Sequence, residues 1–547
     1  MAGSQHLGAD VLVIGAGGAG MYAALEAARR GASVVLVDRS LIGRGGATVM
    51  AQMTVAVGLD DDGLDHWEHH YADTLKAGRG LCDPALAELL CAQGPVRIRE
   101  MDAWGVGWAR ENGEQGGKLK RAFAPGHDRP RCVYVDFLNT GPAVSKTLRA
   151  RLNATPEIRR IGDLHVTSFA VQHGQCVGAV ALHVPTGHVV SISSNATIVA
   201  TGGLTRLYQR NSASLNMAGD GYALALAAGA ELVDMEFVQF FPIGHLAPRL
   251  IGMDPIMWDP FRYKLGGRLL NGAREEFIHK YGGVDEGRYV ATRDLVTYAV
   301  VKEVAAGRGS PHGGAWLSFE HCSEEALRAA AGPVIDRLAA NGIDLTRQAI
   351  EVAPIAHYHM GGVKADARMA TRVPGLFAAG EAVGGANGAN RLSGNAITEA
   401  LVFGARAGES AASFSKQHPT KAPPAAFATH AHALGTGTPS SFNPAAGIEA
   451  LQATMQQDVG PFRTDASLKR AIERIAALRR EAAPAKPPAG RPFDTALLDW
   501  LDLDTMTRVG DIVARMALAR TESRGAHQRE DFPGMDERWQ RNQVVTP

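Results

Sequence analysis

The segment that most constrains the fold is residues 10–38, which contains a complete strand, glycine turn, helix and second strand. DVLVIG is a β-rich run, GAGGAG follows at 15–20, MYAALEAARRG has helical character up to Gly31, and ASVVLVD is a second apolar strand. A G-x-G-x-x-G sequence inside such a unit, with an acidic residue closing the second strand, is typical of dinucleotide binding. The segment therefore predicts an α/β nucleotide-binding domain.

The glycines of this turn have separate expected roles. Gly15 makes the tight turn, Gly17 admits a pyrophosphate, and Gly20 lets helix and strand approach each other. Asp38, at the end of the second strand, can accept a hydrogen bond from a ribose hydroxyl. The alternative is a Rossmann unit that has lost its ligand.

A second glycine-rich segment, residues 375–412, repeats the order of strand, loop and helix. It begins with the apolar run LFA, passes through a Gly/Asn-rich loop that contains Arg391, and continues as an apolar helix from about Asn395. Unpaired N–H groups and the helix dipole at such a site favour an anionic or electron-rich group, such as a reduced isoalloxazine. Arg391 can hold a substrate carboxylate there. The alternative is a surface loop with a solvated arginine.

Composition excludes several classes of protein. A chain of 547 residues is too long for one core, and 56 basic against 56 acidic residues give no reason to expect nucleic acid as a partner. Five dispersed cysteines without a CxxC pair indicate reduced thiols in a cytoplasmic protein, with no iron–sulfur cluster, haem or other metal on this chain. The N-terminus lacks a signal-peptide pattern, and residues 11–28 are broken by four glycines and Glu26, so we expect no direct membrane insertion.

Changes in pattern along the chain predict an inserted domain and a separate C-terminal part. Aromatic, proline and charged residues increase after about 240, the nucleotide fold resumes near 357, and helical spacing characterises 447–480 and 494–522. The predicted boundaries are 1–238 and 355–415 for the nucleotide-binding domain, 239–354 for the insertion, 416–443 for a linker and 444–547 for a helical domain.

Taken together, short motifs in a shared order resemble the succinate dehydrogenase/fumarate reductase flavoprotein family, which includes L-aspartate oxidase and the adenylylsulfate reductase flavoprotein. The likeness runs almost end to end. The motifs are GAGGAG (15–20), TLKAGRGLCD (74–83), ATGG (200–203), GDGYALALAAGAEL (219–232), MEFVQFFPIG (235–244), ATRD (291–294), HYHMGG (357–362), GLFAAGEA (375–382), GANRLSGN (388–395) and ARTESRGAHQREDFP (519–533).

The resemblance implies bound FAD, an α/β Rossmann-like FAD-binding domain, an inserted α+β capping domain and a C-terminal helical domain. Glu381 matches the glutamate that holds the ribityl chain; the alternative is a solvated loop carboxylate. The residues expected to contact FAD are Gly15, Gly17, Gly18, Gly20, Asp38, Arg39, Gly46, Ala47, Thr48, Ala51, Gln52, Thr201, Gly202, Asp220, Gly380, Glu381, Arg391, Gly394, Asn395, Ala396 and Ile397.

Three side chains match the catalytic positions of the family. Arg293 corresponds to the arginine acid/base that moves a proton while hydride passes between flavin N5 and a carbon; the alternative is an ion pair with Asp294. His357 and Arg391 match the pair that binds one substrate carboxylate. A structural role is the alternative for His357, and the expected role for His359.

The chain also departs from the family at informative positions. At about the position of Ala47, respiratory members of the family have a histidine that is covalently bonded to FAD. We therefore expect noncovalent FAD in this chain. Phe241 replaces the histidine of QFHPTG. In DPFRYKLGG, Asp259 replaces a carboxylate-binding threonine, and Pro260 and Tyr263 replace the Glu and Arg of the proton relay.

Losing a charge-assisted hydrogen bond costs roughly 1.5–3 kcal/mol, so these changes disfavour a dicarboxylate by roughly a hundredfold. We predict dehydrogenation, or the reverse, at the α,β C–C bond of a monocarboxylate with an apolar or cyclic remainder, with Phe241, Trp258 and Asp259 in contact with substrate. The alternatives are an L-aspartate oxidase-like or C4-dicarboxylate oxidoreductase, and an electron-transferring flavoprotein subunit of an iron–sulfur complex. The electron acceptor is either oxygen or a separate redox protein.

The charged C-terminal segment 522–533 has two possible interpretations. It can face a redox partner, or its mixed charges can join a helix end to the domain beneath. The second interpretation is favoured, because such clusters around one glycine more often serve a structural role.

Overall fold

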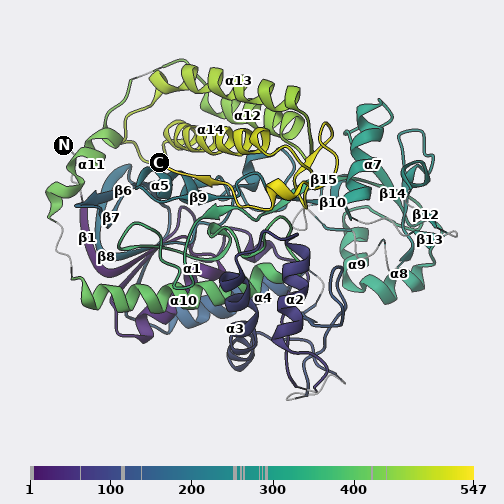
Figure 1. Ribbon diagram of the computed structural model, residues 1–547, viewed down its shortest axis with the longest axis horizontal. Coiled ribbons are helices and arrows are strands. Elements are labelled where there is room, and N and C mark those ends of the chain that lie inside the picture. Colours follow the sequence, from purple (N-terminus) through teal and green to yellow (C-terminus); the bar gives the residue numbers. More distant parts are fainter. Residues whose placement is uncertain are drawn as a thin grey trace. The chain divides into compact units, whose positions relative to one another are not determined.

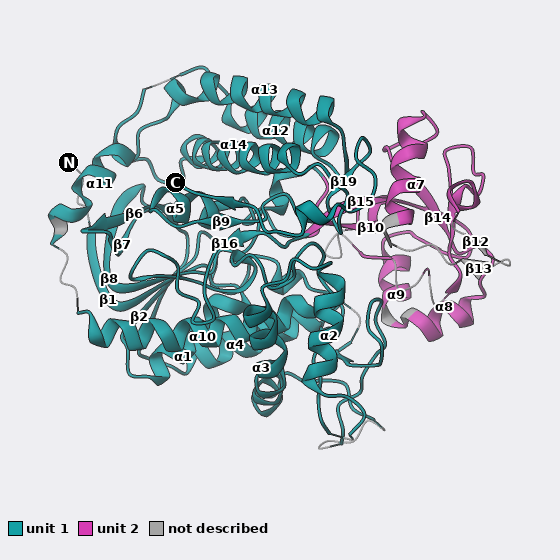
Figure 2. Ribbon diagram, in the orientation of Figure 1, with its two compact units in different colours: residues 1–209, 213–238, 358–547 teal, residues 210–212, 239–357 magenta. Residues whose placement is uncertain are grey.

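The computed structural model describes residues 5–61, 63–111, 117–136, 138–250, 256–258, 262, 265–282, 284–285, 288–289, 293–419, 423–438 and 440–547. The described part of the chain divides into two compact units (Figure 2). Unit 1 comprises 1–209, 213–238 and 358–547, and unit 2 comprises 210–212 and 239–357. The domain boundaries predicted above stay predictions.

The main sheet of unit 1 carries the predicted βαβ segment at its centre. Its strand order is β5-β2-β1-β8-β7-β6, and β17 also pairs with β8. The strands are β1 (Gln5–Ile14), β2 (Val34–Val37), β5 (Ile158–Ile161), β6 (Leu164–Gln172), β7 (Gln175–His183), β8 (His188–Val199) and β17 (Leu376–Ala378). β1 pairs in parallel with β2 and β8, whereas β6, β7 and β8 form an antiparallel meander. All four residues of β2 are buried, as expected for a parallel strand covered on both faces.

Two helices from distant parts of the chain pack on each other beside this sheet. α1 (Gly18–Arg29) follows the glycine turn, and α10 (Asn395–Gln417) follows the second glycine loop (Figure 1). A Cβ at Gly404 would lie 2.5 Å from the carbonyl oxygen of Ala19, so the glycine lets the two backbones come close. This packing brings both predicted helix N-termini into one unit.

The remaining elements of unit 1 surround this core. They are η1 (Thr48–Met50), β3 (Val55–Ala56), α2 (Trp67–Ala77), α3 (Pro84–Ala103), β4 (Cys132–Val133), α4 (Thr140–Asn153), η3 (Thr205–Leu207), α5 (Asp220–Ala227), β9 (Leu232–Val233), β16 (Gly362–Val363), η5 (Gly380–Ala382), η6 (Pro424–Phe427), α11 (Ala428–Gly435), α12 (Pro444–Asp458), β18 (Phe462–Arg463), α13 (Asp465–Ala482), η7 (Ala483–Ala485), α14 (Thr495–Ala519), β19 (Gln528–Arg529), η8 (Glu537–Trp539) and β20 (Val544–Val545). α12, α13 and α14 pack together, as the helical spacing predicts. No described helix combines the length and apolar composition needed to cross a membrane.

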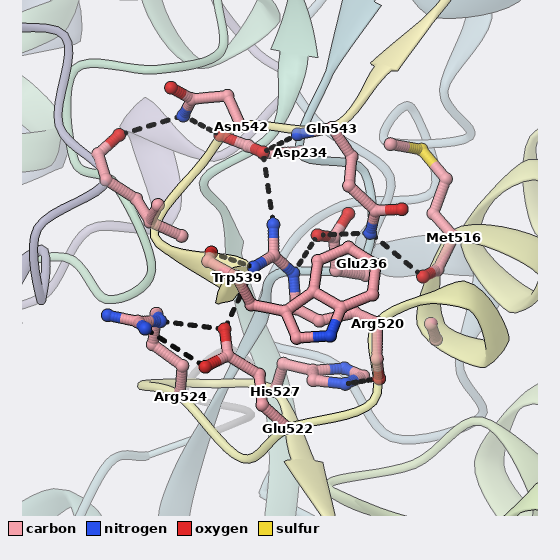
Figure 3. A network of polar contacts seen from close by, with 12 residues as sticks. Asp234, Glu236, Met516, Arg520, Glu522, Arg524, His527, Trp539, Asn542 and Gln543 are labelled. Atoms are coloured by element: carbon pink, nitrogen blue, oxygen red, sulfur yellow. Dashed lines mark hydrogen bonds and ion pairs between the residues drawn. The ribbon is translucent and has the colours of Figure 1, made fainter. Parts of the chain in front are cut away.

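Beyond α14, the chain is joined to the segment that follows β9 in unit 1 by buried ion pairs (Figure 3). The Arg520 guanidinium lies 2.6 Å from Glu236 and 2.9 Å from Glu522, and all three side chains are fully buried. Glu522 also binds Arg524 at 2.7 Å. β20 then pairs with β9. The structure thus agrees with the structural interpretation of segment 522–533.

Unit 2 mixes helices with a small sheet, as expected of an α+β insertion. The sheet order is β10-β15-β14-β11, and a separate hairpin joins β12 and β13. The elements are β10 (Val238–Ala247), β11 (Arg268–Leu270), η4 (Ile278–Tyr281), β12 (Val284–Asp285), β13 (Arg288–Tyr289), α7 (Arg293–Ala305), β14 (Ala315–Ser318), α8 (Glu324–Ala331), α9 (Pro333–Ala340) and β15 (Ile350–His359). β10 and β15 present the predicted residues Phe241 and His357.

Candidate functional site

The first glycine turn has the conformation that its sequence predicts. Gly15 has φ +99°, and a Cβ there would collide with the Ala200 carbonyl at the end of β8. A Cβ on Gly20 would collide with the carbonyl of Gly15. Only glycine fits both positions, so the turn leaves its backbone open to a close ligand.

The N-terminus of α1 supplies donors and a positive dipole end to this turn. Gly17 is the N-cap residue and has no side chain of its own to cap the helix. The Gly18 N–H donates to Thr48 Oγ1 at 3.1 Å, so the segment that contains Thr48 lies against the turn. Asp38 accepts hydrogen bonds from the N–H groups of Ala16 at 2.6 Å and Ser40 at 2.8 Å. Burial raises the pKa of the Asp38 carboxyl above its usual value.

The segment between β2 and β3 is held by neighbouring loops. The Gly46 N–H donates to Ser214 Oγ at 2.7 Å, and Ala47 precedes the short helix η1. The Ala51 carbonyl accepts from Gly141 at the start of α4 at 2.7 Å. Gln52 is buried. The predicted FAD contacts of this segment therefore lie on an ordered stretch.

Arg39, next to Asp38, belongs to a network of ion pairs. The sequence predicted two of its members as site residues, Arg39 and Asp220, but not Asp502. The Arg39 guanidinium lies 3.1 Å from Asp220 of α5 and 2.6 Å from Asp502 of α14. Arg206 also binds Asp502. Burial alone would raise the pKa of Asp502, but Arg39 and Arg206 lower it. Asp502 was missed by the sequence analysis; its signal is an aspartate on the apolar face of a helix.

This network also contains a geometric candidate for a metal site. The ligand atoms of His165, Asp220 and Asp502 lie within 4.8 Å of one another. The guanidiniums of Arg39 and Arg206 already bind the aspartates. Two fixed cations repel a third, so the group is an ion-pair network rather than a metal centre.

Further residues that are predicted to contact FAD lie in the segments that follow β8 and β17. Thr201 Oγ1 is buried and has no hydrogen-bond partner among the described residues, and Gly202 has φ +75°. Glu381 accepts a hydrogen bond from the His359 N–H at 3.0 Å, and burial raises its pKa to about 8. Gly380, with φ +64°, packs against Ala19 of α1. These positions all belong to unit 1, and their contacts with FAD stay predictions.

Arg391 lies in the loop before α10, together with the first residues of that helix. Its guanidinium carbon is 4.5 Å from the centroid of the Tyr358 ring, and the residue is buried. Gly394, with φ +87°, is the N-cap residue of α10, and no described side chain caps the helix. Asn395 lies 2.7 Å from His70 Nε2, so His70 of α2 fixes this helix start. Ala396 and Ile397 follow in the first turn.

In unit 2, His357 and Phe241 are neighbours on adjacent strands. His357 Nδ1 lies 2.7 Å from Ser212 Oγ, and the Phe241 ring packs edge-on against the imidazole with centroids 5.7 Å apart. Phe241 also forms an apolar cluster with Met257 and Ile355. His357 therefore has an oriented ring with an apolar neighbour.

The other predicted site residues in this part of the chain are Trp258, Asp259 and Arg293. Trp258 is buried, its indole N–H donates to His245 Nδ1 at 3.1 Å and its ring lies beside Phe319, and its predicted contact with substrate stays a prediction. Met257 is the residue that the structure brings to Phe241. Arg293 begins α7. Asp259, with Pro260 and Tyr263, lies outside the described residues.

The residues of unit 1 fit FAD. Two helices begin at N-cap glycines, the glycines leave room for close approach, and the Thr201 hydroxyl is buried without a partner among the described residues. These features suit a ligand with a pyrophosphate and polar ring edges. Asp38 stands where a ribose hydroxyl would donate.

Comparison with known proteins agrees with this fit. The family model described as FAD binding domain matches residues 10–397, and that of the fumarate reductase flavoprotein C-terminus matches residues 448–547. One polypeptide of the CoM/CoB fumarate reductase of Methanothermobacter marburgensis is 34% identical over 97% of this chain and 96% of its own length. An L-aspartate oxidase of Streptomyces coelicolor is 33% identical over 98% and 91%.

A solved structure gives the same answer for the fold. Mycobacterium smegmatis Sdh1 in complex with UQ1 is 33% identical, with a TM-score of 0.89 over 99% of this chain and 94% of that one. The resemblance, the fold class and the FAD cofactor predicted from the sequence are thereby confirmed. The chain belongs to the succinate dehydrogenase/fumarate reductase flavoprotein family of FAD-dependent oxidoreductases, which also includes L-aspartate oxidase.

Proposed function

We propose that this enzyme transfers hydride between FAD and the α,β carbons of a carboxylic acid that has one carboxylate and an apolar or cyclic remainder. The observation that carries the proposal is the packing of Phe241 against His357, with Met257 and Ile355 behind it. An apolar wall beside a carboxylate-binding imidazole favours a ligand whose far end is apolar, because the side chains of Phe241, Met257 and Ile355 offer no hydrogen-bond donor to a second carboxylate.

The roles of the polar residues follow from their chemistry. The guanidinium of Arg391 can bind a carboxylate with two donors. His357, oriented by Ser212, is proposed to bind the same carboxylate. Arg293 is proposed to move the proton at the carbon next to the one that exchanges hydride. FAD supplies the two-electron chemistry when bound.

The proposed FAD is noncovalent. The methyl side chain of Ala47 offers no atom for a bond to the flavin, and Ala47 lies directly before η1 in the segment that covers the glycine turn. Acid precipitation of the yellow protein is therefore expected to leave all flavin absorbance in the supernatant. Flavin that stays with the pellet would contradict this part of the proposal.

The electron acceptor is proposed to be oxygen or a separate redox protein. The five dispersed cysteines lack the spacing of a cluster site, so electrons must leave FAD for another molecule. Hydrogen peroxide formed during turnover in air would favour oxygen. Turnover that requires a co-purifying iron–sulfur protein would instead favour the role of an electron-transferring flavoprotein in a larger complex.

The substrate proposal is tested with purified holo-protein under anaerobic conditions. Saturated mono- and dicarboxylic acids and L-aspartate are offered to the oxidised flavin, and unsaturated acids to the chemically reduced flavin. We expect monocarboxylates with a ring or alkyl group to give the fastest change in flavin absorbance. Arg391→Ala should abolish the response, while Arg391→Lys keeps a weaker one because one donor geometry is lost. A normal response in Arg391→Ala would refute the proposed binding role.

A further inference from the structure

A buried carboxylate lies in unit 1 close to Arg391, the proposed carboxylate anchor. Glu399 of α10 is 1% exposed. Its Oε2 accepts hydrogen bonds from the Tyr358 hydroxyl and from Asn387 Nδ2, both at 2.7 Å. Its Oε1 is buried and has no hydrogen-bond partner among the described residues. A carboxylate with one unsatisfied oxygen in such a place is costly when ionised.

The same tyrosine connects Glu399 to Arg391. The Tyr358 hydroxyl donates to Glu399, and the Arg391 guanidinium lies over the ring of Tyr358, 4.5 Å from its centroid. Glu399 and Arg391 are thus opposite charges separated by a single aromatic side chain in a buried environment. At low effective dielectric, a charge at this range changes the attraction that Arg391 exerts on an anionic ligand.

The neighbours of Glu399 leave few groups that change charge near neutral pH. Burial raises the pKa of Tyr222 and Tyr358 well above the usual value, so both phenols stay neutral. Burial lowers the pKa of His70 to about 3 and of His359 to about 4, so both imidazoles stay neutral as well. Glu381 is a partly buried carboxyl that interacts electrostatically with Glu399, and desolvation raises its pKa to about 8.

Glu399 itself is placed to titrate close to neutrality. Burial raises its pKa to about 7, although the donors Tyr358 and Asn387 and the charge of Arg391 favour ionisation. A ligand carboxylate bound at Arg391 would add a second negative charge nearby. Binding would then favour the protonated form of Glu399, so ligand uptake and proton uptake become linked.

We propose that Glu399 is a positioning residue whose charge sets the strength with which Arg391 binds a substrate carboxylate. When Glu399 is neutral, the positive charge of the Arg391 guanidinium attracts the ligand carboxylate. When Glu399 is ionised, its negative charge offsets this attraction. The inference rests on the proposed function, since it takes Arg391 as the ligand's anchor.

The test measures the dissociation constant of a simple monocarboxylate, benzoate, for holo-protein from pH 5.5 to 8.5 by the change in flavin absorbance. From pH 5.5 to 8.5, the dissociation constant of the wild type should rise by a factor about ten times larger than that of Glu399→Gln, as expected for a like charge at short range. Glu399→Gln mimics the neutral acid, so it should bind benzoate like the wild type at pH 5.5 and more tightly at pH 8.5. A purely structural role for Glu399 cannot produce tighter binding.

Two further variants complete the design. Tyr358→Phe removes a donor that favours ionised Glu399, so the weakening should move to higher pH. Glu409→Gln removes a partly exposed carboxylate from the same helix, where it pairs with Arg30, and should leave the pH profile unchanged.

The outcomes separate the two proposals. Benzoate binding that weakens with pH equally in wild type and Glu399→Gln overturns the role of Glu399, and so does binding to Glu399→Gln that is no tighter than wild type at pH 8.5. If holo-protein binds benzoate but Arg391→Ala binds it equally well, the proposed function itself fails. Absence of binding by any carboxylate at any pH refutes both.

Discussion

Replacing Phe241 by histidine should move the enzyme toward dicarboxylates. Phe241 is 6% exposed, and its ring centroid lies 5.7 Å from that of His357. A histidine at 241 would put a second donor beside the first, where the family motif QFHPTG has one. The substitution therefore restores a hydrogen bond to a second carboxylate without altering Arg391 or its neighbours in unit 1.

The size of the change follows from the bond that is gained. A hydrogen bond to a charged group contributes roughly 1.5–3 kcal/mol. Burying an imidazole beside Met257 and Ile355 costs roughly 1–3 kcal/mol, but this cost falls on the folded protein and is the same for every ligand. The ratio of dicarboxylate to monocarboxylate activity should therefore rise by about tenfold or more, since each 1.4 kcal/mol is a factor of about ten.

The assay compares kcat/KM for fumarate and cinnamate, with chemically reduced holo-protein reoxidised by each acid. Phe241→Leu is the matched control, because it removes the ring but supplies no donor, and its preference should stay with cinnamate. An unchanged ratio in Phe241→His, in a variant that retains FAD, would refute the reasoning that residue 241 sets the preference.

Three further predictions concern the cofactor and the fold. Gly15→Ala should be purified with little FAD because its Cβ meets a backbone carbonyl, whereas Gly31→Ala, also at positive φ but in open space, should retain it; flavin absorbance measures both. Arg520→Met removes the ion-pair partner of the buried Glu236 and one of the two arginines that bind Glu522, and should lower the free energy of unfolding in urea by about 3–5 kcal/mol, while the exposed Arg538→Met should change it little. Because the folded-state pKa of Glu399 is raised to about 7, the stability that this group contributes to the wild type is lost as pH rises from about 4.5 to 7. Over that range, the free energy of unfolding of Glu399→Gln in urea should therefore rise relative to that of the wild type by up to about 3 kcal/mol. No such gain would contradict the raised pKa.

Much of unit 1 could be predicted from local pattern. The turn at Gly15 and Gly20 requires glycine for steric reasons that the spacing of the motif already expresses. The N-terminus of α10 was likewise predicted near Asn395, because a Gly/Asn-rich loop precedes an apolar helix. Such features depend on residues close in sequence, so the pattern carries them.

Contacts between distant segments could not be predicted in the same way. Asp502 joins Arg39 across most of the chain, and His70 binds Asn395 from a helix far upstream. The link from Glu399 through Tyr358 to Arg391 depends on how α10 lies beside the end of β15. No periodicity encodes these pairs, because they depend on the tertiary packing of separate elements.

The placement of Trp258 shows a further limit. Its size and apolar character predict contact with substrate, and this stays a prediction; the structure adds that its indole contacts His245 and Phe319, while the adjacent Met257 packs with Phe241. Successive residues of an extended segment point in opposite directions. A sequence position alone could not tell which of the two neighbours faces Phe241.

The central claim is that FAD exchanges hydride with a ligand held through one carboxylate. The most direct test is an anaerobic competition in which reduced holo-protein is mixed with equal concentrations of fumarate and cinnamate, and the saturated products are counted. The account predicts that 3-phenylpropanoate exceeds succinate by at least about tenfold. An excess of succinate would contradict it.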